Sequence, residues 1–201
     1  MPLAEASADY ARIEDALLYL AEHADEQPSL EALAARASLS APHFQRVFQR
    51  WAGVSPKRFV QYLTKTHALS LLEAGRSVFD ASLEVGLSSP SRLHDLLVEH
   101  EALSPGEVRR GGQGLELVFD LGPTPFGPAV FAESARGLVA LSFLERDDEA
   151  AAISELAARL PRARLERGPE RAAYWAERIF ESAVGAAELR LHLRGTRFQL
   201  K

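Results

Sequence analysis

One pattern occurs twice in this chain and constrains its fold more than any other feature. Residues 37–56 read ASLSAPHFQRVFQRWAGVSP, and residues 86–105 read GLSSPSRLHDLLVEHEALSP. Each segment gives a turn, a helix start with Ser and Pro, an apolar helix and a closing Ser-Pro pair, because serine caps helices and proline is tolerated in the first helical turn. The duplication predicts two helix-turn-helix units, with a long helix between them as a spacer.

The first unit runs from Ser29 to Trp51. Its first helix has apolar residues at positions 30, 33, 34 and 37, the spacing of one helix face. Ser40 is expected to cap the second helix. In that helix Phe44, Val47, Phe48 and Trp51 repeat the apolar spacing, so its aromatic residues are expected to be core and not stacking platforms for single strands.

The opposite side of this second helix is polar. A helix that presents amide and guanidinium groups is typical of a recognition helix in the DNA major groove, where Arg reads guanine and Gln reads adenine. Arg46 and Gln49 are the candidates for base contact, and Lys57 and Arg58 are candidate backbone anchors. The alternative for each is an ordinary solvated helix face. The full set of predicted DNA-binding residues is Pro42, His43, Gln45, Arg46, Gln49, Arg50, Lys57, Arg58, Ser89, Ser91 and Arg92.

The remaining helical elements follow from apolar periodicity. We expect a loose tail over residues 1–8, an amphipathic packing helix over 9–23 with Tyr10 in its apolar stripe, and a long helix over 56–74 with Tyr62 on its buried side. Gly75 is placed to end the long helix, and Gly86 to supply the second turn.

The formal net charge of −5 argues against a nucleic-acid partner, but the distribution of charge favours one. No Asp or Glu lies between Glu31 and Glu73. A local cationic surface attracts phosphates whatever the overall charge. The cations of that stretch are Arg36, Arg46, Arg50, Lys57, Arg58 and Lys65.

Several classes of function are not expected. The chain has no cysteine, which excludes disulfides, thiolate metal sites and a cysteine nucleophile within these residues. No apolar run of membrane-spanning length and no signal-peptide pattern occurs, so a cytoplasmic protein without membrane contact is expected. The histidines show no metal-ligand spacing, and no nucleotide-binding glycine loop stands out. We expect no metal, no cofactor and no small-molecule ligand.

After Arg110 the composition changes, and a small α+β domain is predicted over residues 115–195. Gly111 to Gly114 are interpreted as a linker. Strands are expected over 115–121, 126–133 and 138–144 as an antiparallel meander. Helices are expected over 147–160, capped by Asp147 or Asp148, and over 169–184, followed by a strand over 188–193.

Residues 9–110 resemble the DNA-binding domain of AraC-type transcription regulators. The resemblance rests on residues in fixed register, among them Phe44-Gln45-Arg46-Val47-Phe48, Gly53-Val54-Ser55-Pro56, Gly86, Ser104-Pro105 and Arg109. It implies an all-α double helix-turn-helix domain that places two recognition helices in successive major grooves of double-stranded DNA. RNA polymerase is a further expected partner of such a regulator.

The second unit departs from that family pattern. Gly86-Leu87 stands where the family has Gly-Phe, and Leu93-His94-Asp95-Leu96 replaces an aromatic-Arg-aromatic series. Asp95 and Glu99 would repel phosphates. The second recognition helix is therefore expected to contribute Arg92, serine hydroxyls and its N-terminus to phosphate contacts, without sequence-specific base contact.

The stretch GLELVFDLGPTPFGPAVFAESARGLVALSFL (residues 114–144) resembles the amino-terminal, ribonuclease-like domain of O6-alkylguanine-DNA alkyltransferases. The ending LHLRGTRFQLK resembles the place where their catalytic domain begins, so residues 196–201 are expected to be the start of a truncated catalytic domain. An AraC-type domain followed by an alkyltransferase is the order of Ada-type proteins. Alkyl transfer requires a thiolate, which these residues lack. The chain is therefore expected to be a fragment of a longer protein or a truncated descendant that kept only binding.

These observations leave three hypotheses. The leading one is a sequence-specific, double-stranded DNA-binding transcription regulator of the Ada type. The second is the non-catalytic part of a methylated-DNA–protein-cysteine methyltransferase whose acceptor domain lies outside these residues. The third is a protein-interaction module with residual affinity for DNA.

Overall fold

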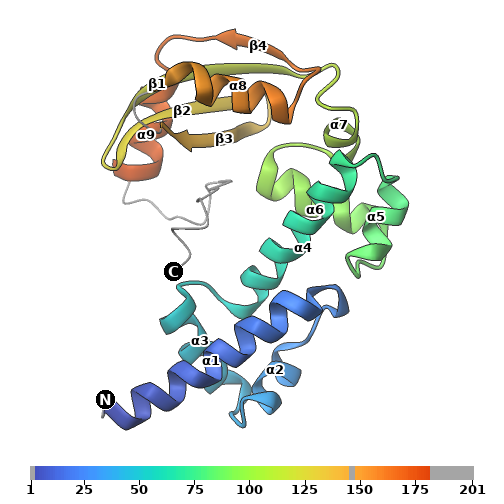
Figure 1. Ribbon diagram of the computed structural model, residues 1–201, viewed down its shortest axis with the longest axis vertical. Helices are drawn as coiled ribbons and strands as arrows, with labels where there is room; N and C mark the ends of the chain where they lie inside the picture. The colour runs from blue at the N-terminus through green and yellow to red at the C-terminus, as the bar shows by residue number, and fades with distance from the viewer. Residues whose placement is uncertain (1–2, 145–147, 182–201) are drawn as a thin grey trace. The chain divides into compact units, whose positions relative to one another are not determined.

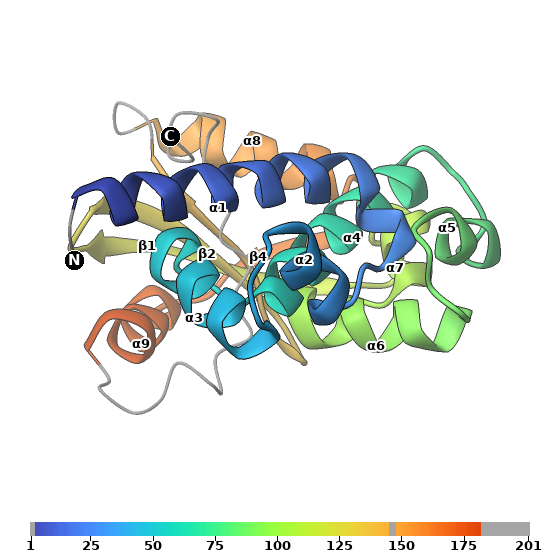
Figure 2. The same cartoon turned by 90° about the horizontal axis from the view of Figure 1, so that it is seen from below.

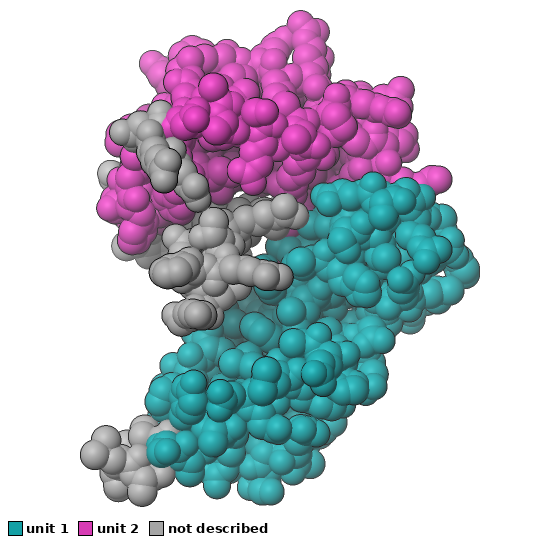
Figure 3. Space-filling model, viewed as in Figure 1, with its two compact units in different colours: residues 1–93 teal, residues 94–201 magenta. Residues whose placement is uncertain are grey.

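The computed structural model describes residues 3–144 and 148–181, and the chain divides into two compact units between Leu93 and His94 (Figures 1 and 3). This division falls inside helix α6, whereas the glycine-rich segment 111–114 lies within the second unit. The functional division at that segment stays a prediction.

Helices make up the first unit, and they follow the predicted order. They are α1 (Leu3–His23), a 3-10 turn (Ala24–Glu26), α2 (Leu30–Arg36), α3 (Ala41–Ala52), α4 (Pro56–Glu73), α5 (Val78–Glu84) and the start of α6 (Pro90–Glu101). The predicted tail over residues 1–8 is wrong from Leu3 onward, where α1 already begins. The positive φ angles of Gly75 (+87°) and Gly86 (+74°) agree with their predicted turns.

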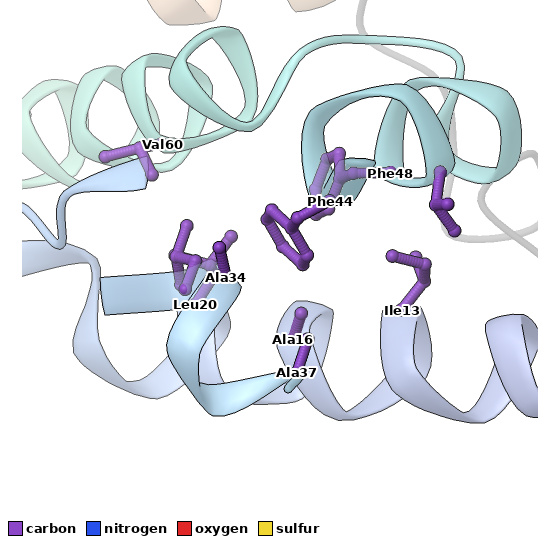
Figure 4. Packing of buried hydrophobic residues seen from close by; sticks show 10 residues of the cluster. Ile13, Ala16, Leu20, Ala34, Ala37, Phe44, Phe48 and Val60 are labelled. Carbon is purple, nitrogen blue, oxygen red and sulfur yellow. The ribbon is translucent and has the colours of Figure 1, made fainter. Parts of the chain in front are cut away.

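The core around the first helix-turn-helix joins α1, α2, α3 and the first turns of α4. Phe44, Val47 and Phe48 are almost fully buried, and Figure 4 shows Phe44 pointing from α3 toward α1, from which Ile13 projects. Full burial of an aromatic side chain of this size contributes about 1.5–3 kcal/mol. This packing fixes which face of α3 is left for solvent.

Three aromatic expectations are wrong. Trp51, expected in the core, is 41% exposed, and its ring makes an edge contact with the ring of Tyr10. Tyr10, expected in the apolar stripe of its helix, is itself 52% exposed. Tyr62, expected on the buried side of α4, is 38% exposed. Trp51 lies in the last turn of α3, beyond the part of that helix that meets the core, so helical periodicity alone overestimated its burial.

Serine capping of the helices differs between the two sites that the sequence singled out. The Ser55 hydroxyl accepts a hydrogen bond from the Arg58 N–H at 3.4 Å, as expected for the N-cap of α4. Ser40 occupies the N-cap position of α3, but its side chain accepts no capping hydrogen bond, so that expectation is wrong. Pro42, at the second helical position, has no N–H to donate to it.

Gln27 connects three elements of the first compact unit. Its backbone is left-handed (φ 49°), and its side-chain Nε2 donates to the Ala24 carbonyl at 2.9 Å, the Thr64 hydroxyl at 2.9 Å and the Val85 carbonyl at 3.0 Å. One amide thereby connects the 3-10 turn, the middle of α4 and the end of α5. These contacts hold the end of α5 against α4 and the 3-10 turn.

A four-stranded sheet forms the centre of the second unit. Its strands are β1 (Glu116–Thr124), β2 (Gly127–Ser134), β3 (Gly137–Phe143) and β4 (Arg164–Arg167), in the order β3-β2-β1-β4. The predicted antiparallel meander is confirmed by β1, β2 and β3, and β4 pairs in parallel with β1. Sequence analysis missed β4, whose polar sequence RLER lacks an apolar run.

One helix covers each face of this sheet (Figures 1 and 2). Helix α8 (Glu149–Arg159) packs on the face of Val130, Ala132 and Ala140, and α9 (Arg171–Ala176) packs on the opposite face. Asp148 caps α8 by accepting from the Ala151 N–H at 2.9 Å, one of the two caps expected.

The predicted helix over 169–184 is an α-helix only to Ala176 and continues as a π-helical turn over Glu177–Glu181. The rest of that helix, the strand expected over 188–193 and the segment 196–201 lie outside the described residues.

Helix α7 (Pro105–Arg109) begins with a capping box and joins α6 to the sheet. The Glu107 carboxylate accepts from the Ser104 N–H at 2.7 Å and the Ser104 hydroxyl at 2.8 Å, and it forms an ion pair with Arg136. Arg136 also donates to the Ala102 carbonyl at 3.0 Å. Partial burial raises the pKa of Glu107, but the hydrogen bonds from Arg136 and Ser104 outweigh it and place the pKa below the ordinary value of 4.5.

A carboxyl group whose pKa is lowered in the folded state stabilises the protein above its ordinary pKa and loses that effect as the pH falls through the folded-state pKa. We therefore expect Glu107→Gln to reduce the free energy of unfolding at pH 7, and the difference from wild type to shrink below pH 4.5. Urea unfolding of both proteins between pH 7 and pH 3 measures this. A difference that stays constant with pH would contradict the assignment.

Candidate nucleic-acid interface

Helix α3 presents all of its predicted DNA-binding side chains to solvent. The same 12-residue helix buries Phe44, Val47 and Phe48, so the packing described above determines the direction of its polar face. The exposed residues on α3 are Pro42, His43, Gln45, Arg46, Gln49 and Arg50.

Three of these side chains are available to a partner. Among the described residues, no hydrogen bond or ion pair engages the side chain of Gln45, Arg46 or Gln49. An exposed guanidinium without a carboxylate keeps its charge and its planar set of donors for a ligand. The amides beside it can donate and accept at once, which the edge of an adenine requires.

The cationic surface is smaller than the sequence predicted. Arg36 is bound to Asp15 on α1 by two hydrogen bonds, of 2.8 and 3.1 Å, and lies over the Tyr19 ring at 4.6 Å. The hydrogen bond from Arg36 holds the pKa of the Asp15 carboxyl below its ordinary value. Lys65 is only 6% exposed. Arg36 is exposed but neutralised by Asp15, 21 residues earlier, and Lys65 is buried beside the Tyr62 ring, so neither belongs to the group of exposed cations without a carboxylate partner.

Lys57 and Arg58 occupy the first turn of α4, and both are exposed. Their position directly after the Gly53 turn places them at the C-terminal end of α3 along the chain. Together with Arg46 and Arg50, they are the exposed cations of α3 and of the first turn of α4.

The second candidate helix, α6, is less suited to base contact. Ser91 and Arg92 are exposed, and Ser89 is half-buried with its hydroxyl accepting from the Arg92 N–H at 3.4 Å. Asp95 and Glu99 are exposed on the same helix. α6 thus offers one cation and two acids to solvent, as the sequence predicted.

Other kinds of site are not evident in the part of the chain that the structure describes. No group of three or more His, Asp or Glu side chains there could hold a metal ion. Nor does any described helix combine the length and the apolar character that crossing a membrane requires.

Sequence reasoning also missed a group of cations in the second unit. Arg110 and Arg162 are exposed, and their backbones are close, since the Arg162 N–H donates to the carbonyl of Gly111, the residue after Arg110, at 2.8 Å. Their separation of about fifty positions in the sequence, and the missed strand β4 that follows Arg162, concealed this proximity.

Comparison with known proteins supports the helical part of this description. Residues 33–111 match a family described as a helix-turn-helix domain. The bifunctional transcriptional activator/DNA repair enzyme Ada of Escherichia coli (strain K12) is 32% identical over 135 residues, which cover 67% of this chain and 38% of that protein.

Two other relatives are regulatory proteins by name. The regulatory protein ada of Salmonella typhimurium is 25% identical over 177 residues (85% of this chain, 49% of that protein), and the melibiose operon regulatory protein of Escherichia coli (strain K12) is 24% identical over 102 residues (50% and 34%). The chain therefore spans between a third and a half of the length of these relatives. The crystal structure of the DNA-binding domain of AdpA with a target DNA is 30% identical, with a TM-score of 0.46, over 48% of this chain and 88% of that one.

Proposed function

We propose that this chain, which carries an AraC-type helix-turn-helix domain, binds a specific sequence of double-stranded DNA and thereby regulates transcription. The observation that carries the proposal is α3, whose apolar side is anchored in the core while Gln45, Arg46 and Gln49 are exposed and form no side-chain hydrogen bond or ion pair with the residues that the structure describes. A helix held in this way can enter a major groove without losing its own packing.

The chemistry of the exposed face matches base edges. The Arg46 guanidinium has the geometry to donate two hydrogen bonds to guanine O6 and N7, and the amides of Gln45 and Gln49 have the geometry to pair with adenine N6 and N7. Arg50, Lys57 and Arg58 would hold the flanking phosphates, which fix the register of the helix without reading sequence.

The second helix-turn-helix would bind at the next major groove mainly through contacts to the DNA phosphates. Ser91, Arg92 and the first turn of α6 can contact a phosphate, whereas Asp95 and Glu99 disfavour a close approach further along the helix. Successive grooves on one side of a duplex lie about 34–36 Å apart. One chain would therefore read an asymmetric site, with most of the sequence information at α3.

We further propose that the regulated response is to DNA alkylation, as in the Ada-type proteins. Two of the relatives above carry the name Ada. The α+β part of this chain follows its helical domain, which is the domain order that the resemblance to Ada-type proteins implies. The three-stranded meander, the helix α8 and the parallel strand β4 are compatible with a ribonuclease-like domain of alkyltransferases. These 201 residues contain no cysteine, so any alkyl acceptor would belong to residues beyond them.

Incubation with O6-methylguanine DNA followed by intact-mass measurement tests the catalytic side of this proposal. We expect no gain in mass for the 201-residue chain. A gain of one methyl group would contradict the assignment of this chain as a binding part only.

Selection from a pool of random duplexes tests the regulator proposal itself. We expect a defined motif to be enriched, with an affinity that falls steeply as salt rises because each phosphate contact releases counterions. Recovery of duplexes without any shared motif would reject sequence-specific binding and favour an interaction module with residual DNA affinity.

Arg46→Ala is expected to weaken binding to the selected duplex by about 1–3 kcal/mol, which is the typical value of a bidentate contact to guanine. Fluorescence anisotropy with labelled duplex measures the change. Arg36→Ala is the matched control, because it removes one cation from the same unit where Asp15 already neutralises it. An Arg46→Ala variant that folds and binds as tightly as wild type would remove α3 from the interface.

A further inference from the structure

We propose that Arg109, Arg110 and Arg162, here called the second-unit arginine cluster, form an additional phosphate-contact surface for the same duplex. The inference rests on the proposed function and deepens it, because it extends DNA contact beyond the two recognition helices to the end of α7 and to Arg162 in the α+β part.

The backbone positions of the three residues come from two parts of the second unit that lie next to each other. Arg109 ends α7 and Arg110 follows it, while Arg162 lies just before β4. The Arg162 N–H donates to the Gly111 carbonyl at 2.8 Å, and a Cβ atom at Gly111 would lie 3.9 Å from the Arg162 Cγ. The end of α7 and the start of β4 are therefore directly adjacent.

The backbone that carries the cluster is held by its own hydrogen bonds. The N–H of Gly111 donates to the Val108 carbonyl at 2.9 Å, and the N–H of Gly112 donates to the Glu107 carbonyl at 2.8 Å. Gly112 is buried. The positions of the cluster thus belong to a closed turn, which lowers the entropy lost when a ligand is bound.

What distinguishes these arginines is the absence of a carboxylate partner. In the described part of the second unit, ion pairs neutralise Arg136, Arg159, Arg164, Arg167 and Arg171, and Arg178 lies over the Tyr174 ring. No ion pair is formed within the described residues by Arg109, Arg110 or Arg162, all of which are exposed. Glu107, the closest acid in the sequence, is already bound to Arg136.

A duplex backbone is the ligand that fits a group of unneutralised guanidiniums without a pocket. Phosphates follow one another along a strand, and each can accept from one guanidinium, so neighbouring arginines can act together without enclosing the ligand. Three residues (102–104) separate α6 from α7, so the cluster follows the second helix-turn-helix closely along the chain. A duplex held by that domain is the polyanion that the cluster would meet.

The salt dependence of binding tests the proposal. For a B-form duplex, the slope of log K against log[salt] changes by about 0.9 for each phosphate contact. The triple variant Arg109→Ala, Arg110→Ala, Arg162→Ala is therefore expected to lower that slope by up to about 2.7 on a selected duplex that extends beyond the core motif. Its preference for the motif over a random duplex should stay unchanged, since phosphate contacts carry no sequence information.

The control is a second triple variant, Arg164→Ala, Arg167→Ala, Arg171→Ala, which changes the net charge equally at positions already paired with carboxylates. We expect its slope to remain near that of wild type. Equal slopes for the two triple variants would overturn the inference while leaving the regulator proposal intact, and a wild-type chain without specific binding would overturn both. If the first triple variant does not fold, single Arg109→Gln and Arg162→Gln changes carry the same expectation, a slope lower by about 0.9 each.

Discussion

Gly86→Ala is expected to destabilise the first unit by about 2–5 kcal/mol. Gly86 has φ +74°, a conformation that costs a side chain about 1–2 kcal/mol. A Cβ atom there would lie 1.6 Å from the carbonyl oxygen of Asp25, which is backbone and cannot swing aside as a side chain can. Relief would require the turn between α5 and α6 to move away from the 3-10 turn, at the additional cost of about 1–3 kcal/mol typical of overpacking.

Gly53→Ala provides the matched control for this prediction. Gly53 has the same φ of +74°, but a Cβ atom at Gly53 would have no neighbour within 4 Å. This change should therefore cost only the conformational term, about 1–2 kcal/mol. Urea unfolding monitored by circular dichroism measures both, and equal losses of stability would contradict the close contact between Gly86 and Asp25.

The same contact has a consequence for DNA binding. Because Gln27 and the Gly86 turn hold the end of α5 against the 3-10 turn and α4, a displacement there would disturb the start of the second helix-turn-helix. If Gly86→Ala still folds, we expect it to bind the selected duplex more weakly and to keep its preference among bases.

Glu101→Ala is expected to destabilise the second unit by about 3–5 kcal/mol, the usual cost of removing one partner of a buried ion pair. Glu101 has a fully buried side chain and accepts from Arg159 Nη2 at 2.7 Å, while Arg159, 12% exposed, also donates to the Val139 carbonyl at 3.3 Å. Without Glu101, the guanidinium would remain buried without its carboxylate. The pair joins Glu101, the last residue of α6, to Arg159, the last residue of α8, so its loss should loosen the end of α6 from α8.

Glu166→Ala is the control, because its ion pair with Arg164 has side chains that are 54% and 70% exposed. Exposed pairs contribute about 0–1 kcal/mol. A double replacement of Glu101 and Arg159 by apolar residues of similar volume should recover much of the stability, since no buried charge would remain. A Glu101→Ala variant no less stable than Glu166→Ala would contradict this account of the pair.

Local sequence was sufficient for most of the helical domain. Helix starts such as Ser55-Pro56, the turn glycines 75 and 86, and the apolar spacing of Phe44, Val47 and Phe48 depend on neighbours a few residues away, which periodicity describes. The exposure of Gln45, Arg46 and Gln49 followed from that spacing.

Several of the errors share a physical cause, because they depend on residues distant in the sequence. Trp51 meets Tyr10 on α1 and not the core, and Arg36 is neutralised by Asp15. Strand β4 is formed by pairing with β1, since its polar residues have no signal of their own. The adjacency of Arg110 and Arg162 depends on that same pairing, so it became visible only in three dimensions.

The central claim is that the exposed face of α3 reads bases in a major groove. Its most direct test compares wild type and Arg46→Ala on the selected duplex and on variants of it that carry every single base-pair change. We predict that Arg46→Ala loses discrimination at one or two adjacent base pairs and retains it elsewhere. An unchanged profile, or a uniform loss at every position, would contradict base reading by α3.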